Sequence, residues 1–207
     1  MKNTFKTIST KKINKIMTTR GYNPNSEYWN RVFIDDTGYC YFLNAFQITR
    51  IPAFLVDLND PNLKSVFIED LEDKSAIENM MKLFYETVTS AADLVNDYKD
   101  VFTVDRFNLK NQLAYIKKEY KKEYHGIAAA MSPFALKFGK KEDDYKALVN
   151  AQYLLDLLYL HPDRDIKIIA GNPLKPLVIG NGNDEILSIL MPTRGADISK
   201  TIYINEV

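Results

Sequence analysis

The residues that could carry acid–base, nucleophilic or metal chemistry are few in this 207-residue chain. The chain contains two histidines, His125 and His161, and a single cysteine, Cys40, within the apolar run 39–46. Catalysis needs a nucleophile with its base, a metal cluster or a phosphate-binding loop, and the sequence shows none of these at its usual spacing. We therefore predict no catalytic residue, no enzymatic activity, no metal site and no cofactor.

Three further polar motifs are two pairs of adjacent carboxylates, Asp35-Asp36 and Asp143-Asp144, and the sequence His161-Pro162-Asp163. All three lie among turn-forming residues, and we interpret them as turns. His-Pro-Asp is also the signature of J-domain co-chaperones, where it joins two helices, whereas a predicted strand follows it here. An enzyme of unrecognised type remains a hypothesis that requires Asp35, Asp36 or Asp163 to converge in one cleft with perturbed acidity.

Lysines on two predicted helices, at about 10–19 and 108–124, are the clearest functional signal. Ammonium groups on a helix face can neutralise DNA phosphates and release counterions without reading the bases. Lysine is also common on solvated helices, and Glu119 and Glu123 dilute the positive field, so a plain surface role stays open. The candidate DNA-binding residues are Lys11, Lys12, Lys15, Arg20, Lys110, Lys117, Lys118, Lys121 and Lys122.

The order of the predicted elements indicates an α+β fold that would position these helices. We predict helices at 10–19, 74–93, 108–124 and 147–160, strands at 28–34, 39–48, 65–68, 127–131, 134–138, 166–170, 177–179 and 186–191, and a connector with strand character at 97–104. Helices that alternate with antiparallel hairpins collect on one face of a sheet. Residues 1–97 and 98–194 read as two similar domains, followed by the extension 195–207.

The composition is that of a folded chain without a strong overall charge. Apolar residues make up 46% and charged residues 26%, and Lys plus Arg equals Asp plus Glu at 27 each. Any electrostatic function must therefore come from how the charges are distributed. One cysteine forms no intrachain disulfide, the N-terminus has no stretch like a signal peptide, and no window reaches the ~18 apolar residues of a membrane span. We expect a cytoplasmic protein without a membrane partner.

Six segments of the chain match, in the same order, segments of one known family. The match is specific over about 147–194, where 149–158 is similar to a helix and Met191-Pro192-Thr193-Arg194 is similar to a closing Met-Pro-X-Arg segment. The other four segments are 41–48, 97–102, 165–170 and 172–179. The family that they resemble is the bacterial DNA sliding clamp, the beta subunit of DNA polymerase III, in its second and third domains.

This resemblance implies a DNA-clamp fold, in which a closed ring encircles duplex DNA, helices line the hole and sheets form the outer rim. The lysine-bearing helices fall at positions that face DNA in such rings. The resemblance also implies that partner proteins insert a short peptide into an apolar pocket between the two domains. The residues at the pocket positions are Leu43, Ala45, Phe46, Ile48, Val101, Ile189, Met191 and Pro192.

The expected function is therefore a clamp-like DNA-tethering or processivity factor that holds DNA polymerase or other partners at duplex DNA. The chain carries about two clamp domains instead of three, so a homo-oligomeric six-domain ring would need three copies. In the extension, 202–204 could add a strand or fold over the peptide pocket. A phage or mobile-element relative of the clamp fits this pattern. The alternative is a clamp-fold protein-interaction module that does not encircle DNA.

Overall fold

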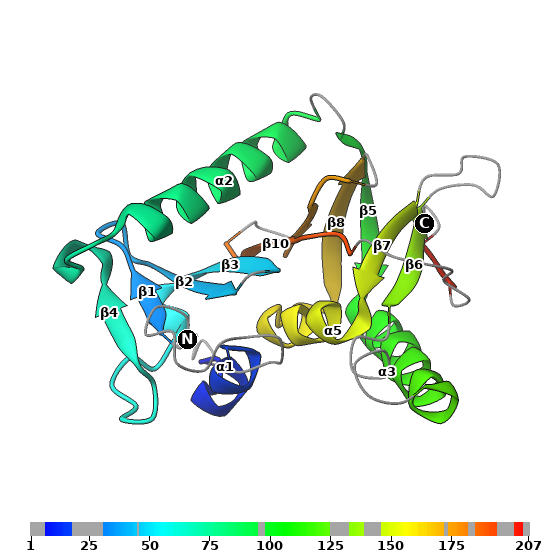
Figure 1. The fold of residues 1–207 in the computed structure, drawn as a ribbon, viewed down its shortest axis with the longest axis horizontal. Coiled ribbons are helices and arrows are strands. Elements are labelled where there is room, and N and C mark those ends of the chain that lie inside the picture. The colour runs from blue at the N-terminus through cyan, green and yellow to red at the C-terminus, as the bar shows by residue number, and fades with distance from the viewer. Residues whose placement is uncertain are drawn as a thin grey trace, which may run out of the picture.

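A computed structural model describes residues 7–17, 31–44, 46–94, 98–124, 133–138, 146–171, 174–181, 185–193 and 201–204 of the chain. The helices in these ranges are α1 (Thr10–Met17), α2 (Ser75–Ala92), α3 (Arg106–Glu123) and α5 (Ala151–Leu160), with short 3-10 turns at Ala53–Leu55 and Ile68–Asp70. Helix α2 lies on one side of a long sheet, whereas α1, α5 and α3 lie on the other (Figure 1).

The main sheet joins the two halves of the chain edge to edge. Its strands are β1 (Val32–Ile34), β2 (Tyr39–Asn44), β3 (Gln47–Pro52), β4 (Ser65–Phe67), β5 (Tyr98–Asp105), β8 (Asp165–Gly171), β9 (Leu177–Gly180) and β10 (Leu187–Leu190). Their order is β4-β1-β2-β3-β10-β9-β8-β5, so each half contributes four neighbouring strands. The halves meet where β3 pairs antiparallel with β10 and places Ile48 opposite Ile189.

A second, smaller sheet has the order β11-β6-β7 and consists of β6 (Pro133–Phe138), β7 (Lys146–Asn150) and β11 (Thr201–Ile204). Strand β11 is parallel to β6 and places Ile202 opposite Leu136. Of the two alternatives for 202–204, the added strand is the one that the structure has. Ile202 and Val149 are buried in the same core as α3 and α5, so the small sheet packs on these helices.

The main sheet is covered on both faces in its N-terminal half. Successive strand residues point to opposite faces, and in β1 this sends Val32 and Ile34 towards α1 but Phe33 towards α2. Ile13 and Ile16 of α1 complete the first core, and Ile77 and Phe84 of α2 complete the second. Burial on both faces explains why β1 and most of β2 are apolar runs without alternation.

Two predicted boundaries were wrong. The run 39–48 is not one strand but the hairpin β2–β3, in which Asn44 pairs with Gln47. Because both strands are buried on both faces, the run carries no alternation that would have marked the turn. The helix predicted at 147–160 begins only at Ala151, since 147–150 belongs to β7. Asn150 caps α5 by accepting hydrogen bonds from the backbone N–H groups of Gln152 and Tyr153.

The strand pair predicted around residue 132 also differs from the structure. The antiparallel partner of β6 is β7, with Leu136 opposite Ala147, and the segment 127–131 lies outside the described residues. The strand character at 97–104 is confirmed, because β5 pairs with β8 along its length. Helix α3 begins at Arg106, two residues before the predicted start, because the Asp105 carboxylate accepts the backbone N–H of Asn108 at 2.8 Å and caps it.

A chain of buried polar groups crosses the seam between the halves. His161 Nε2 lies 2.9 Å from Ser188 Oγ, and Ser188 Oγ lies 2.8 Å from Thr49 Oγ1. Complete burial and, secondarily, the charge of Arg106 lower the pKa of His161 to about 3. His161 follows α5 and is soon followed by β8, so His161-Pro162-Asp163 links a helix to a strand, as predicted, and not two helices.

We expect the protein to lose stability as the pH falls from 6.5 towards 5. The folded state keeps His161 neutral, whereas the unfolded chain binds a proton near the ordinary pKa of 6.5, so acid favours unfolding. At 1.36 kcal/mol per pKa unit, His161 contributes a loss of about 2 kcal/mol at pH 5. Urea unfolding of the wild type and of His161→Gln at pH 7.5 and pH 5.0 measures it. The variant should lose less stability on acidification, and equal losses in both proteins would contradict the assignment.

Candidate nucleic-acid interface

Helix α5 lies between α1 and α3 and contacts both of them (Figure 1). It is an apolar helix whose Leu154, Leu157 and Leu158 have no exposed surface. Helix α3 buries one row of side chains against it, consisting of Leu109, Leu113, Ile116 and Tyr120. The two lysine-bearing helices are thus carried on either side of a rigid, buried helix.

The basic residues of α3 divide into two groups. At 3.6 residues per turn, spacings of four, seven and four place one group along a single stripe beside the buried row. This stripe consists of Arg106, Lys110, Lys117 and Lys121. Lys118 and Lys122 lie further round the helix, and the Nζ of Lys122 forms an ion pair with Glu119 Oε1 at 2.8 Å. The charge of Lys122 is therefore offset by a neighbouring acid.

Two contacts hold the stripe against α5. Lys117 donates a hydrogen bond to Gln152, and the Nζ of Lys110 lies 4.2 Å from the centre of the Tyr159 ring. Lys110 and Lys117 are seven residues apart on α3, and Gln152 and Tyr159 are seven residues apart on α5. Because the earlier residue of each helix contacts the later residue of the other, the two helices run antiparallel with the stripe facing α5. Gln152 in turn donates to Asp156, which has no exposed surface, at 2.7 Å. The lysines of α3 therefore project from a fixed position.

The N-terminal helix brings its own lysine to the same place. Lys12 Nζ lies 5.9 Å from the centre of the Tyr159 ring. Partial burial and the charges of Arg106 and Lys12 together lower the pKa of Lys110. Lys11 is exposed. The side chain of Lys15 is outside the described set, and so is the whole of Arg20. Lysines from both halves thus share one surface, and their binding of DNA remains a prediction.

Sequence reasoning missed two residues of this surface, Arg106 and Tyr159. Arg106 donates hydrogen bonds to the backbone carbonyls of Asp163 at 2.6 Å and Leu158 at 3.3 Å, so it ties the start of α3 to the end of α5. Its spacing of four from Lys110 would have identified it once the helix start was known. For Tyr159 the only signal was a polar-tipped ring in a leucine-rich helix.

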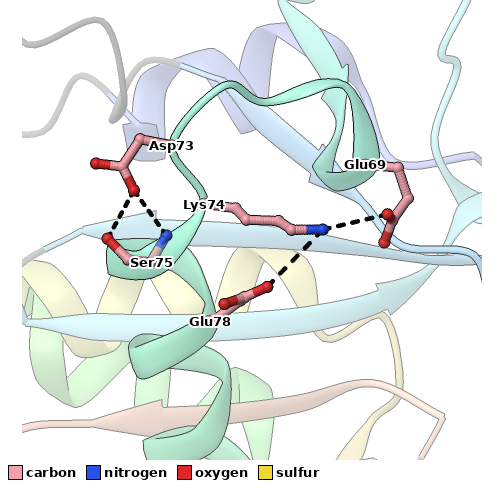
Figure 2. A network of polar contacts seen from close by, with 5 residues as sticks. All are labelled: Glu69, Asp73, Lys74, Ser75 and Glu78. Carbon is pink, nitrogen blue, oxygen red and sulfur yellow. Dashed lines mark hydrogen bonds and ion pairs between the residues drawn. The ribbon is translucent and has the colours of Figure 1, made fainter.

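The opposite side of the sheet carries the opposite charge. Residues 69–93, which include α2, contain two lysines and the acidic residues Glu69, Asp70, Glu72, Asp73, Glu78, Glu86 and Asp93. Figure 2 shows the ammonium group of Lys74 between Glu69 and Glu78, at 3.2 and 3.9 Å. Lys82 likewise pairs with Glu86 at 3.9 Å. Over residues 69–93 the acidic residues outnumber the lysines seven to two, so the α2 side carries net negative charge.

The residues expected to line a peptide pocket lie on different sides of the sheet. Leu43, Ile48 and Ile189 are buried beneath α2, and Met191 packs partly buried at the margin of the same cluster. The Phe46 side chain lies on the other side and stacks on Tyr153 with ring centres 4.8 Å apart. Val101 is exposed on β5, Pro192 is partly buried, and Ala45 falls outside the described residues.

The structure therefore brings only part of this set together on one side of the sheet, and the peptide pocket stays a prediction. Ile77, Phe84 and Ala91 of α2 fill the sheet face in front of the buried members. The backbone nevertheless keeps two of the segments adjacent, because Met191 N donates to the carbonyl of Phe46 at 2.8 Å. Within the described part of this set, Val101 is exposed, and Phe46, Met191 and Pro192 are partly buried.

Of the groups that could carry chemistry, Asp35 and Cys40 have surroundings that fit a structural role. The Asp35 carboxylate accepts the backbone N–H groups of Thr37 and Tyr39, as predicted for a turn. Partial burial raises the pKa of Asp35, but these hydrogen bonds, together with those from the Thr37 and Tyr41 hydroxyls, outweigh it and hold that pKa below its ordinary value. Burial, with the charge of Asp35, raises the pKa of Cys40 to about 12, so its thiol behaves as a small apolar group. The 143–144 pair lies outside the described residues.

Within the described ranges, no three His, Cys, Asp or Glu side chains are grouped so that they could hold a metal ion. None of the helices described above is both long enough and apolar enough to span a membrane.

Comparison with known proteins identifies the fold. No family model and no curated protein sequence matches the chain. The DNA polymerase III subunit beta from Pseudomonas aeruginosa matches 88% of this chain and 64% of its own length, with a TM-score of 0.53 and 13% identity. The beta sliding clamp from C. crescentus matches 91% and 65%, with a TM-score of 0.49 and 12% identity. The Helicobacter pylori beta clamp matches 90% and 63%, with a TM-score of 0.48 and 12% identity.

The chain thus spans less than two thirds of the length of each of these clamps. At such identities the likeness concerns the fold. The P. aeruginosa match covers most of the chain, which agrees with the mixed α+β architecture and the eight-stranded sheet described above. Over that length, this chain has the fold of the bacterial DNA polymerase III beta sliding clamp.

Proposed function

We propose that the protein is a DNA-tethering or processivity factor that holds duplex DNA non-specifically against the layer α1–α5–α3. We call this surface the cationic face, and it consists of Lys11, Lys12, Arg106, Lys110, Lys117 and Lys121. The observation that carries the proposal is that the ammonium groups of Lys12 and Lys110, one from each half of the chain, both lie by the Tyr159 ring. The protein performs no chemical step of its own in this role and acts in the cytoplasm.

The chemistry of the cationic face suits the DNA backbone. Ammonium groups on helix surfaces reach phosphates, and the counterions that they displace supply the binding free energy without regard to sequence. From Arg106 to Lys121 the stripe is roughly 22 Å long at 1.5 Å per residue, enough to follow several phosphates. The acidic side of α2 directs the DNA to one side of the sheet only.

Encircling follows if copies of the chain close into a ring. We propose that residues 1–97 and 98–194 act as two clamp-like domains, and a ring of six such domains then consists of three copies. Partner peptides, such as those of a DNA polymerase, dock on the α2 side. There Val101, Met191 and Pro192 offer the accessible margin of an apolar face whose centre is covered by α2.

Light scattering and fluorescence anisotropy test this function. We expect a homotrimer that stays on nicked circular DNA but is lost from linear DNA. The apparent dissociation constant for a 30-base-pair duplex should rise roughly tenfold to fortyfold between 50 and 200 mM salt, as two or three phosphate contacts in total require. Equal retention on linear and circular DNA would refute encircling. A monomer indifferent to DNA at low salt would refute the proposed function and support the protein-interaction module.

A further inference from the structure

We propose that Tyr159 is a positioning residue that holds Lys12 and Lys110 ready for neighbouring phosphates of one DNA strand. This inference rests on the proposed function and deepens it, because it names the point at which the two halves act together. Tyr159 lies on α5, between the helices that carry the two lysines, and its ring is partly exposed. The ammonium groups lie 4.2 and 5.9 Å from the ring centre.

An aromatic ring holds a lysine differently from a carboxylate. The negative face of the ring attracts the ammonium group but carries no net charge, so the lysine keeps its full charge for a phosphate. Lys122 and Lys74 are held instead by Glu119 and Glu69, and each of these acids offsets the charge that it positions. Of these four lysines, Lys12 and Lys110 are therefore the two that a neutral ring positions, so their charges can still attract a polyanion.

The cations around Tyr159 also repel one another. The pKa of Lys110 is lowered by partial burial and then by the charges of Arg106 and Lys12. Arg106 stays in place because its guanidinium donates to carbonyls of 158 and 163. A phosphate beside these groups relieves their repulsion. The repulsion between the cations in the DNA-free protein therefore favours binding of the anion.

The length of the stripe on α3 favours DNA over an acidic peptide as the source of the anion. Lys117 and Lys121 continue the row for three turns beyond Lys110, and a regular polyanion fits such a row along its length. An acidic peptide is the other source of anions that the same cations could take, and the experiment separates the two.

The experiment compares Tyr159→Leu with Tyr159→Phe in the full chain, using a labelled 30-base-pair duplex at 0.1 M salt. We expect the leucine variant to bind roughly fivefold to tenfold more weakly because both cation–π contacts are lost. The phenylalanine variant should restore most of the binding, since it keeps the ring. Tyr115→Leu is the matched control, because Tyr115 is a 63% exposed tyrosine of α3 that lies off the stripe, and its binding should be unchanged.

A double-mutant cycle separates positioning from a merely structural role. If Tyr159 positions Lys110, then Lys110→Gln should weaken binding less in the Tyr159→Leu background than in the wild type. Additive effects, or a leucine variant that binds like Tyr159→Phe, would overturn the inference while leaving the DNA-binding function intact. If a glutamate decapeptide competes as well as DNA of equal charge, the site is for an acidic partner and the inference fails. Failure of the wild type to bind DNA at low salt would remove the proposed function itself.

Discussion

Replacing Lys110 and Lys121 together by glutamate is expected to weaken the binding of duplex DNA roughly 100-fold at 0.1 M salt. Each substitution removes one phosphate contact with its counterion release and adds a negative charge that repels the backbone. Both residues lie on the stripe of α3 that faces α5, and Lys110 contacts Tyr159. Fluorescence anisotropy with a salt titration measures the effect, and the slope of log affinity against log salt should fall by about two.

Lys74→Glu with Lys82→Glu is the matched control for this charge reversal. It changes the net charge of the chain equally but acts on α2 and the residue before it, where both lysines pair with acids. We expect this variant to bind DNA within about twofold of the wild type, because surface charges more than a Debye length away are screened. If the two double variants weaken binding alike, net charge governs the affinity and the cationic face is not the binding site.

The arrangement of the helices could be predicted from local patterns only in part. The apolar spacing of 74–93 and 108–124 predicts amphipathic helices, and α2 and α3 confirm them. However, an amphipathic helix has one apolar face whichever side of a sheet it covers, so no local pattern decides that α2 packs opposite α1. That choice depends on long-range packing of residues such as Phe84 against Tyr41.

The position of α2 also explains why the accessibility of the candidate lysines could be predicted from the sequence, whereas that of the candidate pocket residues could not. A lysine on a helix surface is exposed wherever the helix lies, and so Lys12 and Lys110 were identifiable before the fold was known. A strand residue such as Ile48 or Ile189 has a side chain whose accessibility depends on what covers the sheet. The resemblance located these residues in their strands, but it did not indicate that a helix of the same chain lies over them.

Phe84→Ala is expected to lower the free energy of unfolding by about 3–5 kcal/mol, the range for a large aromatic side chain lost from a core. Phe84 has no exposed surface, its ring meets that of Tyr41 edge-to-face at 6.3 Å, and the guanidinium of Arg50 lies 6.0 Å from its centre. Urea unfolding gives the magnitude. The neighbouring Leu83→Ala, with Leu83 41% exposed, is the control and should cost less than about 1 kcal/mol.

The same substitution tests whether α2 covers the apolar face that partner peptides would need. Phe84 is a main anchor of α2, so its loss should increase amide hydrogen exchange along α2 before the sheet opens. Leu43, Ile48 and Ile189 then become accessible to an apolar dye. DNA binding below the unfolding temperature should stay within about twofold of the wild type, because the cationic face lies across the sheet and is carried by α5 and not by α2. If DNA binding falls together with the protection of α2, the two sides of the sheet are coupled, and docking of a partner on one side would then release DNA from the other.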